Sequence, residues 1–88
     1  MNEFLLATNK VQDGIQKVYK FPNGYGASAI KHSYSYGGPE GLWELAVLDN
    51  VHELGGDPCY NTEITDDVIG YLTDEDLDVI LVAIKELN

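Results

Sequence analysis

The chain has 88 residues, an ordinary apolar content of 44%, and a formal net charge of −10 from 15 acidic residues against five basic ones, all lysine. That length allows one domain over residues 1–88, and that charge disfavours direct binding to nucleic acid or to an anionic membrane, since both rely on Lys and Arg. The single cysteine, Cys59, excludes an intrachain disulfide, and no Cys/His zinc spacing occurs.

The first half of the chain predicts a pair of strands. Residues 1–13 carry weak signals and are expected to be a lead-in segment without a secretory signal. Residues 15–21 are rich in Ile, Val, Tyr and Phe, which is typical of a strand. Asn23-Gly24 then favours a tight turn, from which residues 25–34 return as a second strand.

Residues 42–48 give the strongest strand signal. Both faces of this stretch are largely apolar, so we expect a central strand covered on both sides. The loops 35–41 and 49–57 flank it. A short fourth strand over 59–64 completes an antiparallel sheet predicted for residues 15–64, with Pro58 at its start or at a sheet edge.

The end of the chain, residues 66–87, is predicted to be helical. A short helical turn is expected over 66–72. Thr73 then caps a second helix with acids in its first turn and an apolar stripe on one side. The predicted fold class is α+β: a four-stranded antiparallel meander with the C-terminal α-helix packed on one face.

Three stretches of this sequence, taken together, resemble segments of a known group of proteins. The segments PNGYGAS, YGGPEGLWELAVL and TDDVIGYLT lie within residues 15–84 and together resemble a group of small, uncharacterised proteins encoded by bacteriophages and prophages. The resemblance implies a phage context and supplies no activity. Small acidic phage proteins often bind and disable a host enzyme or defence complex, so it implies a host protein as partner and the host cytoplasm as location.

A tyrosine-rich loop is the first candidate for a partner-binding surface. Tyrosine offers a large contact area at low conformational-entropy cost, and loops carry much of the function of small domains. Here the tyrosines are followed by a glycine-rich turn. The candidate residues are Tyr25, Tyr34, Tyr36 and Glu40. The alternative is that the tyrosines cover an open sheet face and the glycines only turn the chain.

An acidic surface is the second candidate. Four of the five lysines lie in residues 1–35, whereas 13 of the 15 acids lie in residues 36–88. Such a surface favours a basic partner, or could imitate nucleic acid. Helix capping and solubility are the alternative explanation. The candidate residues are Asp66, Asp67, Asp74, Glu75 and Asp78.

Metal and catalytic chemistry find little support in the sequence. The loop with Asp49, His52, Glu53 and Asp57 contains possible ligands but matches no metal-site spacing, so a solvated loop is expected there. The glycines of residues 24–29 open a strand and not a helix, which argues against a dinucleotide site. No cofactor and no enzymatic activity are therefore expected.

The sequence thus predicts a small, acidic, cytoplasmic interaction protein that binds, and inhibits or modulates, a host protein. Three alternatives stay open. The chain could be a nucleic-acid mimic in the binding groove of a host protein, a structural homodimer formed through the broad apolar C-terminal helix, or a small-ligand binder.

Overall fold

The computed structural model describes residues 2–88. Within them the chain forms six strands, one α-helix and two short 3-10 helices. The elements, in chain order, are η1 (Asn2–Phe4), β1 (Leu5–Val11), β2 (Gly14–Lys20), β3 (Gly26–Lys31), η2 (Gly38–Glu40), β4 (Trp43–His52), β5 (Gly55–Pro58), β6 (Ile69–Leu72) and α1 (Asp74–Lys85).

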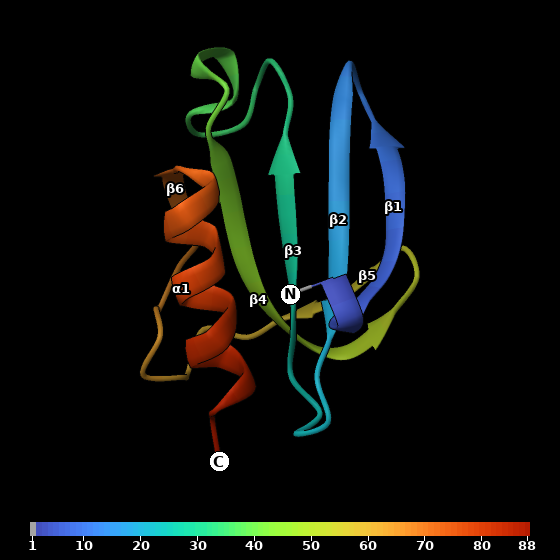
Figure 1. Ribbon diagram of the computed structural model, residues 1–88, viewed down its shortest axis with the longest axis vertical. Coiled ribbons are helices and arrows are strands. Elements are labelled where there is room, and N and C mark those ends of the chain that lie inside the picture. Colours follow the sequence, from blue (N-terminus) through green and yellow to red (C-terminus); the bar gives the residue numbers. More distant parts are fainter. Residues whose placement is uncertain (1) are drawn as a thin grey trace.

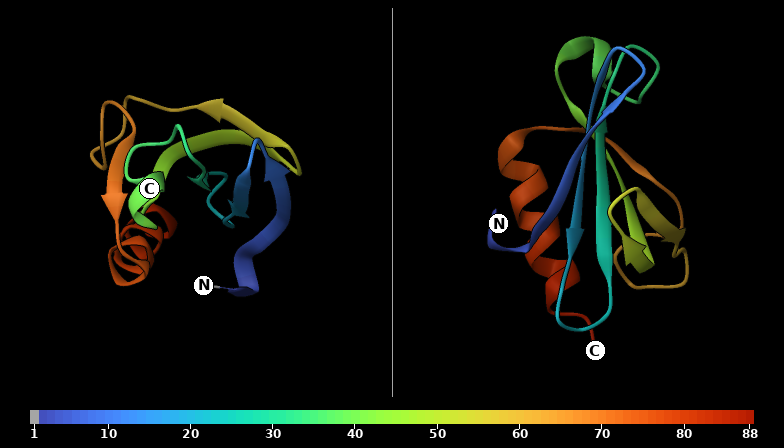
Figure 2. Two further views of the ribbon diagram at one scale, coloured as in Figure 1. Left: turned by 90° about the horizontal axis from the view of Figure 1, so that it is seen from above. Right: turned by 90° about the vertical axis from the view of Figure 1, so that its right-hand side faces the viewer.

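All six strands belong to one antiparallel sheet that curls into a half-barrel (Figures 1 and 2). Four neighbours follow one another as β1-β2-β3-β4, and the long strand β4 then has two partners on its other edge. The first part of β4 pairs with β6, joining Trp43 to Leu72, and the second part pairs with β5, joining Leu48 to Pro58. β4 is therefore the central strand of the fold, as its two apolar faces predicted.

The fold class is the predicted one, but the expectation of four strands is wrong. The lead-in segment 1–13 contains β1, a full strand whose side chains alternate between half-buried and exposed. The loop 49–57 is mostly strand, because β4 runs on to His52 and β5 follows after a short turn. Residues 59–64 are irregular, so the fourth strand was placed too late, although Pro58 does lie on an edge strand.

The helical end was also placed too broadly. Residues 69–72 form β6, and not the helical turn expected over 66–72. Hydrogen bonding to β4 and to the preceding loop, and not local propensity, holds this segment extended.

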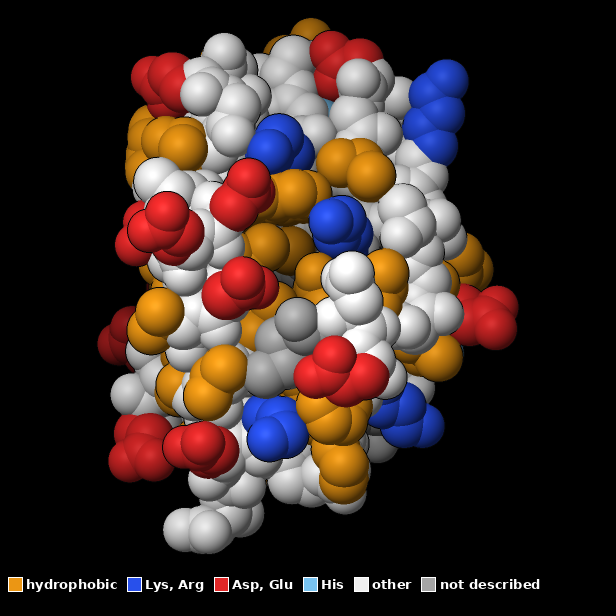
Figure 3. Space-filling view, in the orientation of Figure 1, with side chains coloured by type: hydrophobic (Ala, Val, Ile, Leu, Met, Phe, Trp, Pro, Cys, Tyr) orange, Lys and Arg blue, Asp and Glu red, His pale blue; other side chains and the backbone are white. Residues whose placement is uncertain are grey.

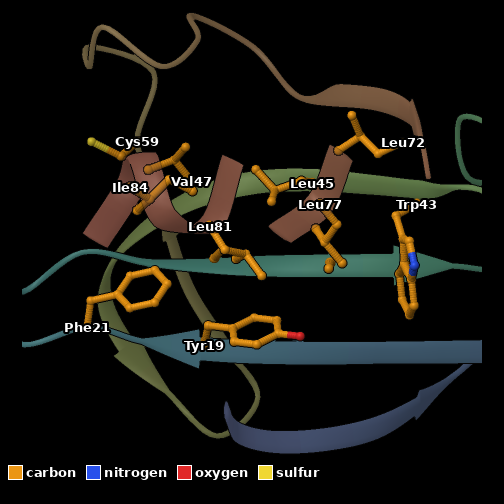
Figure 4. Close-up of a cluster of buried hydrophobic side chains, with 12 residues drawn as sticks. Tyr19, Phe21, Trp43, Leu45, Val47, Cys59, Leu72, Leu77, Leu81 and Ile84 are labelled. Atoms are coloured by element: carbon orange, nitrogen blue, oxygen red, sulfur yellow. The ribbon is translucent and has the colours of Figure 1, made fainter. Parts of the chain in front are cut away.

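Helix α1 follows its sequence signals closely. Thr73 is the N-cap and exchanges hydrogen bonds with Asp76 in a capping box. Leu72 and Leu77, on either side of the cap, are both buried in the core. The helix crosses the concave face of the sheet, over β3 and β4 (Figure 1). There it closes a core that includes Leu45, Val47, Leu77, Leu81 and Ile84 (Figure 4).

The small residues of β3 allow this close packing. Ala27 and Ala29 face the helix side of the sheet and are fully buried. α1 packs directly over this part of β3.

The convex face of the sheet is also partly buried. Val18 is fully buried, and Leu48 nearly so, although neither belongs to the main core cluster. Gln16 links this face by accepting a hydrogen bond from Asn9 and donating one to Ser28, and Asn9 also donates to the carbonyl of Glu53. The end of β4 and its turn therefore fold back across β1 and β2, while Glu44 and Ala46 on the same face of β4 stay half-buried.

The helical content of the fold is modest. No helix within residues 2–88 is long and apolar enough to cross a membrane.

Candidate functional site

The tyrosine-rich loop between β3 and β4 is held rigidly. Ser35, one of the few buried polar residues, accepts a hydrogen bond from the backbone N–H of His32 and donates one to its carbonyl. Gly38 lies so close to the His32 carbonyl and the Ser35 hydroxyl that a Cβ at this position would collide with both. The glycines therefore do more than turn the chain: they allow the loop to pack onto itself.

The same loop is fastened to β6 at Tyr36. The backbone N–H of Tyr71 donates to the carbonyl of Tyr36 at 3.1 Å, and the N–H of Tyr36 donates to the carboxylate of Glu44 at 2.9 Å. Gly70 approaches Tyr36 so closely that a Cβ there would collide with the Tyr36 Cβ. Tyr36 is thus fixed on both sides by strands that lie far apart in the sequence.

Three tyrosine rings are exposed at this end of the molecule. Tyr34 is 80% exposed, and Tyr36 and Tyr71 are each 59% exposed. We call these three residues the aromatic end patch. Glu40, also exposed, lies in η2 within the same loop. The structure therefore places Tyr34, Tyr36 and Glu40 in one exposed loop, with Tyr71, which the sequence did not single out, bonded to that loop.

The backbone of Tyr71 is strained. Its φ of +58° is in the left-handed region, which a bulky side chain rarely adopts. Such conformations cost on the order of 1 kcal/mol or more and concentrate at functional sites. Because the Tyr71 ring is mostly exposed, core packing does not compensate for this strain. The strained residue instead bonds through its backbone N–H to Tyr36 and leaves its own ring exposed.

The structure places Tyr25 away from this patch. Tyr25 lies in the loop between β2 and β3, packs half-buried against the core, and accepts a hydrogen bond from the N–H of Phe21. Its neighbour Asn23 contacts the last turn of α1, whereas the aromatic end patch adjoins the segment before the first turn. The two sites therefore lie at opposite ends of the half-barrel (Figure 1), and Tyr25 is not part of the patch.

Two of the predicted acidic residues are exposed but also act on aromatic side chains of the core. Asp74 accepts a hydrogen bond from the indole N–H of Trp43 at 2.7 Å. The same indole ring, only 5% exposed, lies beneath the ammonium groups of Lys31 and Lys17, 4.2 and 5.3 Å from its centroid. Asp74 thus supports the fold in a partly cationic setting.

Asp78 acts on Tyr19 in the same region. Burial raises the pKa of the Tyr19 phenol above its ordinary value of 10.0, and the nearby charge of Asp78 raises it further. Figure 4 shows the Tyr19 ring on the same side of the sheet as Trp43 and Leu77. Asp78 is therefore an exposed acid whose charge still reaches the buried phenol of Tyr19.

The remaining predicted acids lie farther out. Glu75 is exposed in the first turn of α1. Asp66 and Asp67 are exposed in the connection between β5 and β6, where Asp67 accepts a hydrogen bond from the N–H of Val68. Figure 3 shows acidic side chains along the helix side of the molecule and lysines mainly over the strands. Charge is thus separated across this face, and capping explains only part of the acidic content.

Neither a metal site nor an enclosed pocket is found within residues 2–88. In the loop 49–57, Asp57 accepts a hydrogen bond from the Asn50 side chain, and the Nδ1 of His52 accepts one from Leu54. Cys59 is buried and its thiol contacts the side-chain oxygen of Asn61 at 3.0 Å. These groups make local contacts that stabilise turns.

Comparisons of this chain with protein-family models, with curated proteins and with solved structures gave no match.

Proposed function

We propose that this chain is an interaction protein whose aromatic end patch binds a basic surface on a host protein and thereby inhibits or modulates it. The observation that carries the proposal is Tyr71: it has an exposed ring and a strained backbone, and its N–H bonds to the carbonyl of Tyr36, whose ring is also exposed. Strain that core packing does not offset suggests that the position of the ring is itself under selection.

The chemistry of the patch fits protein recognition. Tyrosines on rigid elements provide contact area and hydroxyl groups without losing much side-chain freedom on binding. The loop that presents them is held by the buried Ser35 and by the bond between Tyr71 and Tyr36. Little ordering is then needed when a partner docks, which favours affinity.

The charge near the patch supports a basic partner. β6 leads directly from Tyr71 into the first turn of α1, where Asp74, Glu75 and Asp76 follow one another. With a net charge of −10, the chain would be steered toward positively charged surfaces. The resemblance to phage proteins makes a host protein in the host cytoplasm the expected partner.

The test is an affinity capture from host lysate with matched variants. Tagged wild-type protein and the variants Tyr71→Gly, Tyr36→Ser and Tyr60→Ser would be compared by mass spectrometry. Tyr60 is a partly exposed tyrosine outside the patch and serves as the control. We expect one host protein to be retained by wild type and Tyr60→Ser and lost from the two patch variants.

The remaining outcomes separate the alternatives. A host protein retained equally by all four chains would mean that the aromatic end patch is not the binding surface. Displacement of that protein by added DNA or RNA, together with a steep loss at high salt, would indicate a nucleic-acid mimic instead.

A further inference from the structure

A second exposed surface lies on the outward side of α1. Val79 is 70% exposed and Val82 is 39% exposed, and Ala83 is also exposed. Spacings of three and four residues place these side chains together on one helix face. That face lies opposite the buried side that carries Leu77, Leu81 and Ile84. We call Val79, Val82 and Ala83 the α1 strip.

Carboxylates surround the α1 strip. Glu75 lies one turn before Val79, and Glu86 lies one turn after Val82. Asp78 lies one turn before Val82, and Asp76 lies two turns before Ala83, so they border the strip on its two sides. All four side chains are exposed. An apolar strip bordered by negative charge resembles the core and rim of a small interface.

The fold itself does not require valine at these positions. Exposed helix positions are best filled by Ala, Glu, Lys or Gln, since branched side chains lose rotamer freedom in a helix. The buried side of α1 already supplies the residues that the core needs. Valine at the exposed positions 79 and 82 therefore lowers the helix propensity of α1 slightly, and neither residue belongs to the core cluster.

We propose that the α1 strip docks a basic amphipathic helix: a segment with apolar residues on one face and Lys or Arg beside them. The four carboxylates match such flanking cations. A second copy of this chain is a poorer occupant, because each copy carries a net charge of −10 and would bring the same carboxylates against the strip. The inference rests on the proposed function, since the docked helix would belong to the partner.

The geometry suits a helical ligand. α1 has 12 residues and so is about 18 Å long, which accommodates roughly three turns of a crossing helix. The side-chain ridges of one helix pack into the grooves between the ridges of another, and small residues such as Ala83 allow a close approach. The strip is also separate from the aromatic end patch, so the two surfaces can be changed independently.

The probe is a fluorescein-labelled peptide of about 18 residues, made of leucine and lysine with the leucines on one helical face. The control peptide has the same composition with leucine and lysine alternating, so it has equal charge but no apolar helical face. Each is titrated by fluorescence anisotropy at about 0.15 M salt against wild type, the double variant Val79→Gln/Val82→Gln, and Tyr71→Gly. The double variant keeps the net charge and replaces exposed side chains only, and circular dichroism would verify its fold.

We expect the helical peptide to bind wild type and Tyr71→Gly alike, and to bind the double variant about tenfold more weakly. Amide chemical-shift changes in wild type should centre on residues 75–86. The control peptide should bind more weakly than the helical peptide.

Several results would overturn the proposal. Equal binding to wild type and the double variant, or no binding at all, would mean that the strip does not recognise a basic helix. Loss of binding in Tyr71→Gly would place the peptide on the aromatic end patch. Self-association of wild type that the double variant abolishes would make a second copy the occupant. None of these results affects the lysate capture by the aromatic end patch, so the two proposals fail separately.

Discussion

The side-chain amide of Asn23 donates a hydrogen bond to the carbonyl of Ile84 at 2.9 Å, and so joins the turn between β2 and β3 to the last turn of α1. The same nitrogen lies 3.0 Å from the carbonyls of Lys85 and Leu87. Its oxygen accepts a hydrogen bond from the N–H of Tyr25. Asn23 therefore caps the C-terminus of α1 by donating to carbonyl groups that have no partner within the helix.

Asn23→Ala should destabilise the protein by about 2 kcal/mol, since half-buried carbonyls lose their donor. Asn23→Asp should be at least as unstable, although it keeps an acceptor for Tyr25, because a carboxylate is repelled by the negative end of the helix. Urea unfolding of both variants measures this. An Asn23→Asp protein as stable as wild type would refute the role of the donor.

Asp74→Ala should destabilise the protein by about 1–3 kcal/mol, because it leaves the nearly buried indole N–H of Trp43 without its acceptor. Asp78→Ala is the matched control: it removes an acid from the same part of α1 but no partner of the indole. Trp43 is the sole tryptophan, so its emission spectrum reports the change directly. Equal effects of the two substitutions would argue against a specific role for the bond.

Tyr71→Gly should be more stable than Tyr71→Ala by about 1 kcal/mol, because only glycine adopts a φ of +58° without strain. In an ordinary strand the order is reversed, since glycine loses more chain entropy on folding. Thermal or urea unfolding of the two variants decides the order. If alanine proved the better residue, the strain argument for the aromatic end patch would be lost.

Tyr19 should make stability depend on alkaline pH. The folded state raises the pKa of this phenol above 10.0, so it favours the protonated form. The protonated phenol therefore contributes to the free energy of unfolding, fully below pH 10 and less and less as the pH rises above that value. Tyr19→Phe should therefore flatten the loss of unfolding free energy between about pH 9.5 and 11. An unchanged slope in the variant would show that other groups dominate.

Asp13 should make stability depend on acidic pH. The backbone N–H of Ser33 donates to its carboxylate at 3.0 Å, and this bond, with the Ser33 side chain, lowers the pKa of Asp13 below 3.8. The Asp13 carboxylate therefore contributes to the free energy of unfolding above pH 3.8, and this contribution declines as the pH falls below that value. Asp13→Asn keeps an acceptor but cannot titrate, so its unfolding free energy should fall less steeply on acidification. The same acid slope in both proteins would contradict this.

The sequence predicted the elements whose signals are local. Thr73 and the acids after it defined the start of α1, and the apolar faces around Trp43 and Leu45 defined the central strand. β1 was missed because an edge strand with polar residues on its open face has little hydrophobic signal. β6 was missed because the contacts of Gly70 and Tyr71 with Tyr36, which help to hold this segment as a strand, are not visible in the local sequence.

The candidate site was likewise predictable only in part. The tyrosine content of the loop identified Tyr34 and Tyr36, and both are exposed. Tyr71 joins them through a bond to Tyr36, which lies 35 positions earlier, and the local hint was the presence of Val68, Ile69 and Tyr71, which favour strands. The hydrogen bond from Trp43 to Asp74 could not be predicted either, because a contact between side chains far apart in the sequence produces no periodic pattern.

The central position of β4 also has a consequence for the chain during synthesis. β6 covers one edge of β4 near Trp43 and Leu45, and α1 covers the apolar side chains beside it. Both elements are made last, so a nascent chain that ends before residue 69 leaves an apolar strand edge open. Open edges of this kind recruit strands from other chains. This topology therefore makes unfinished chains prone to aggregate during synthesis, and a chaperone that covers the open edge would prevent this.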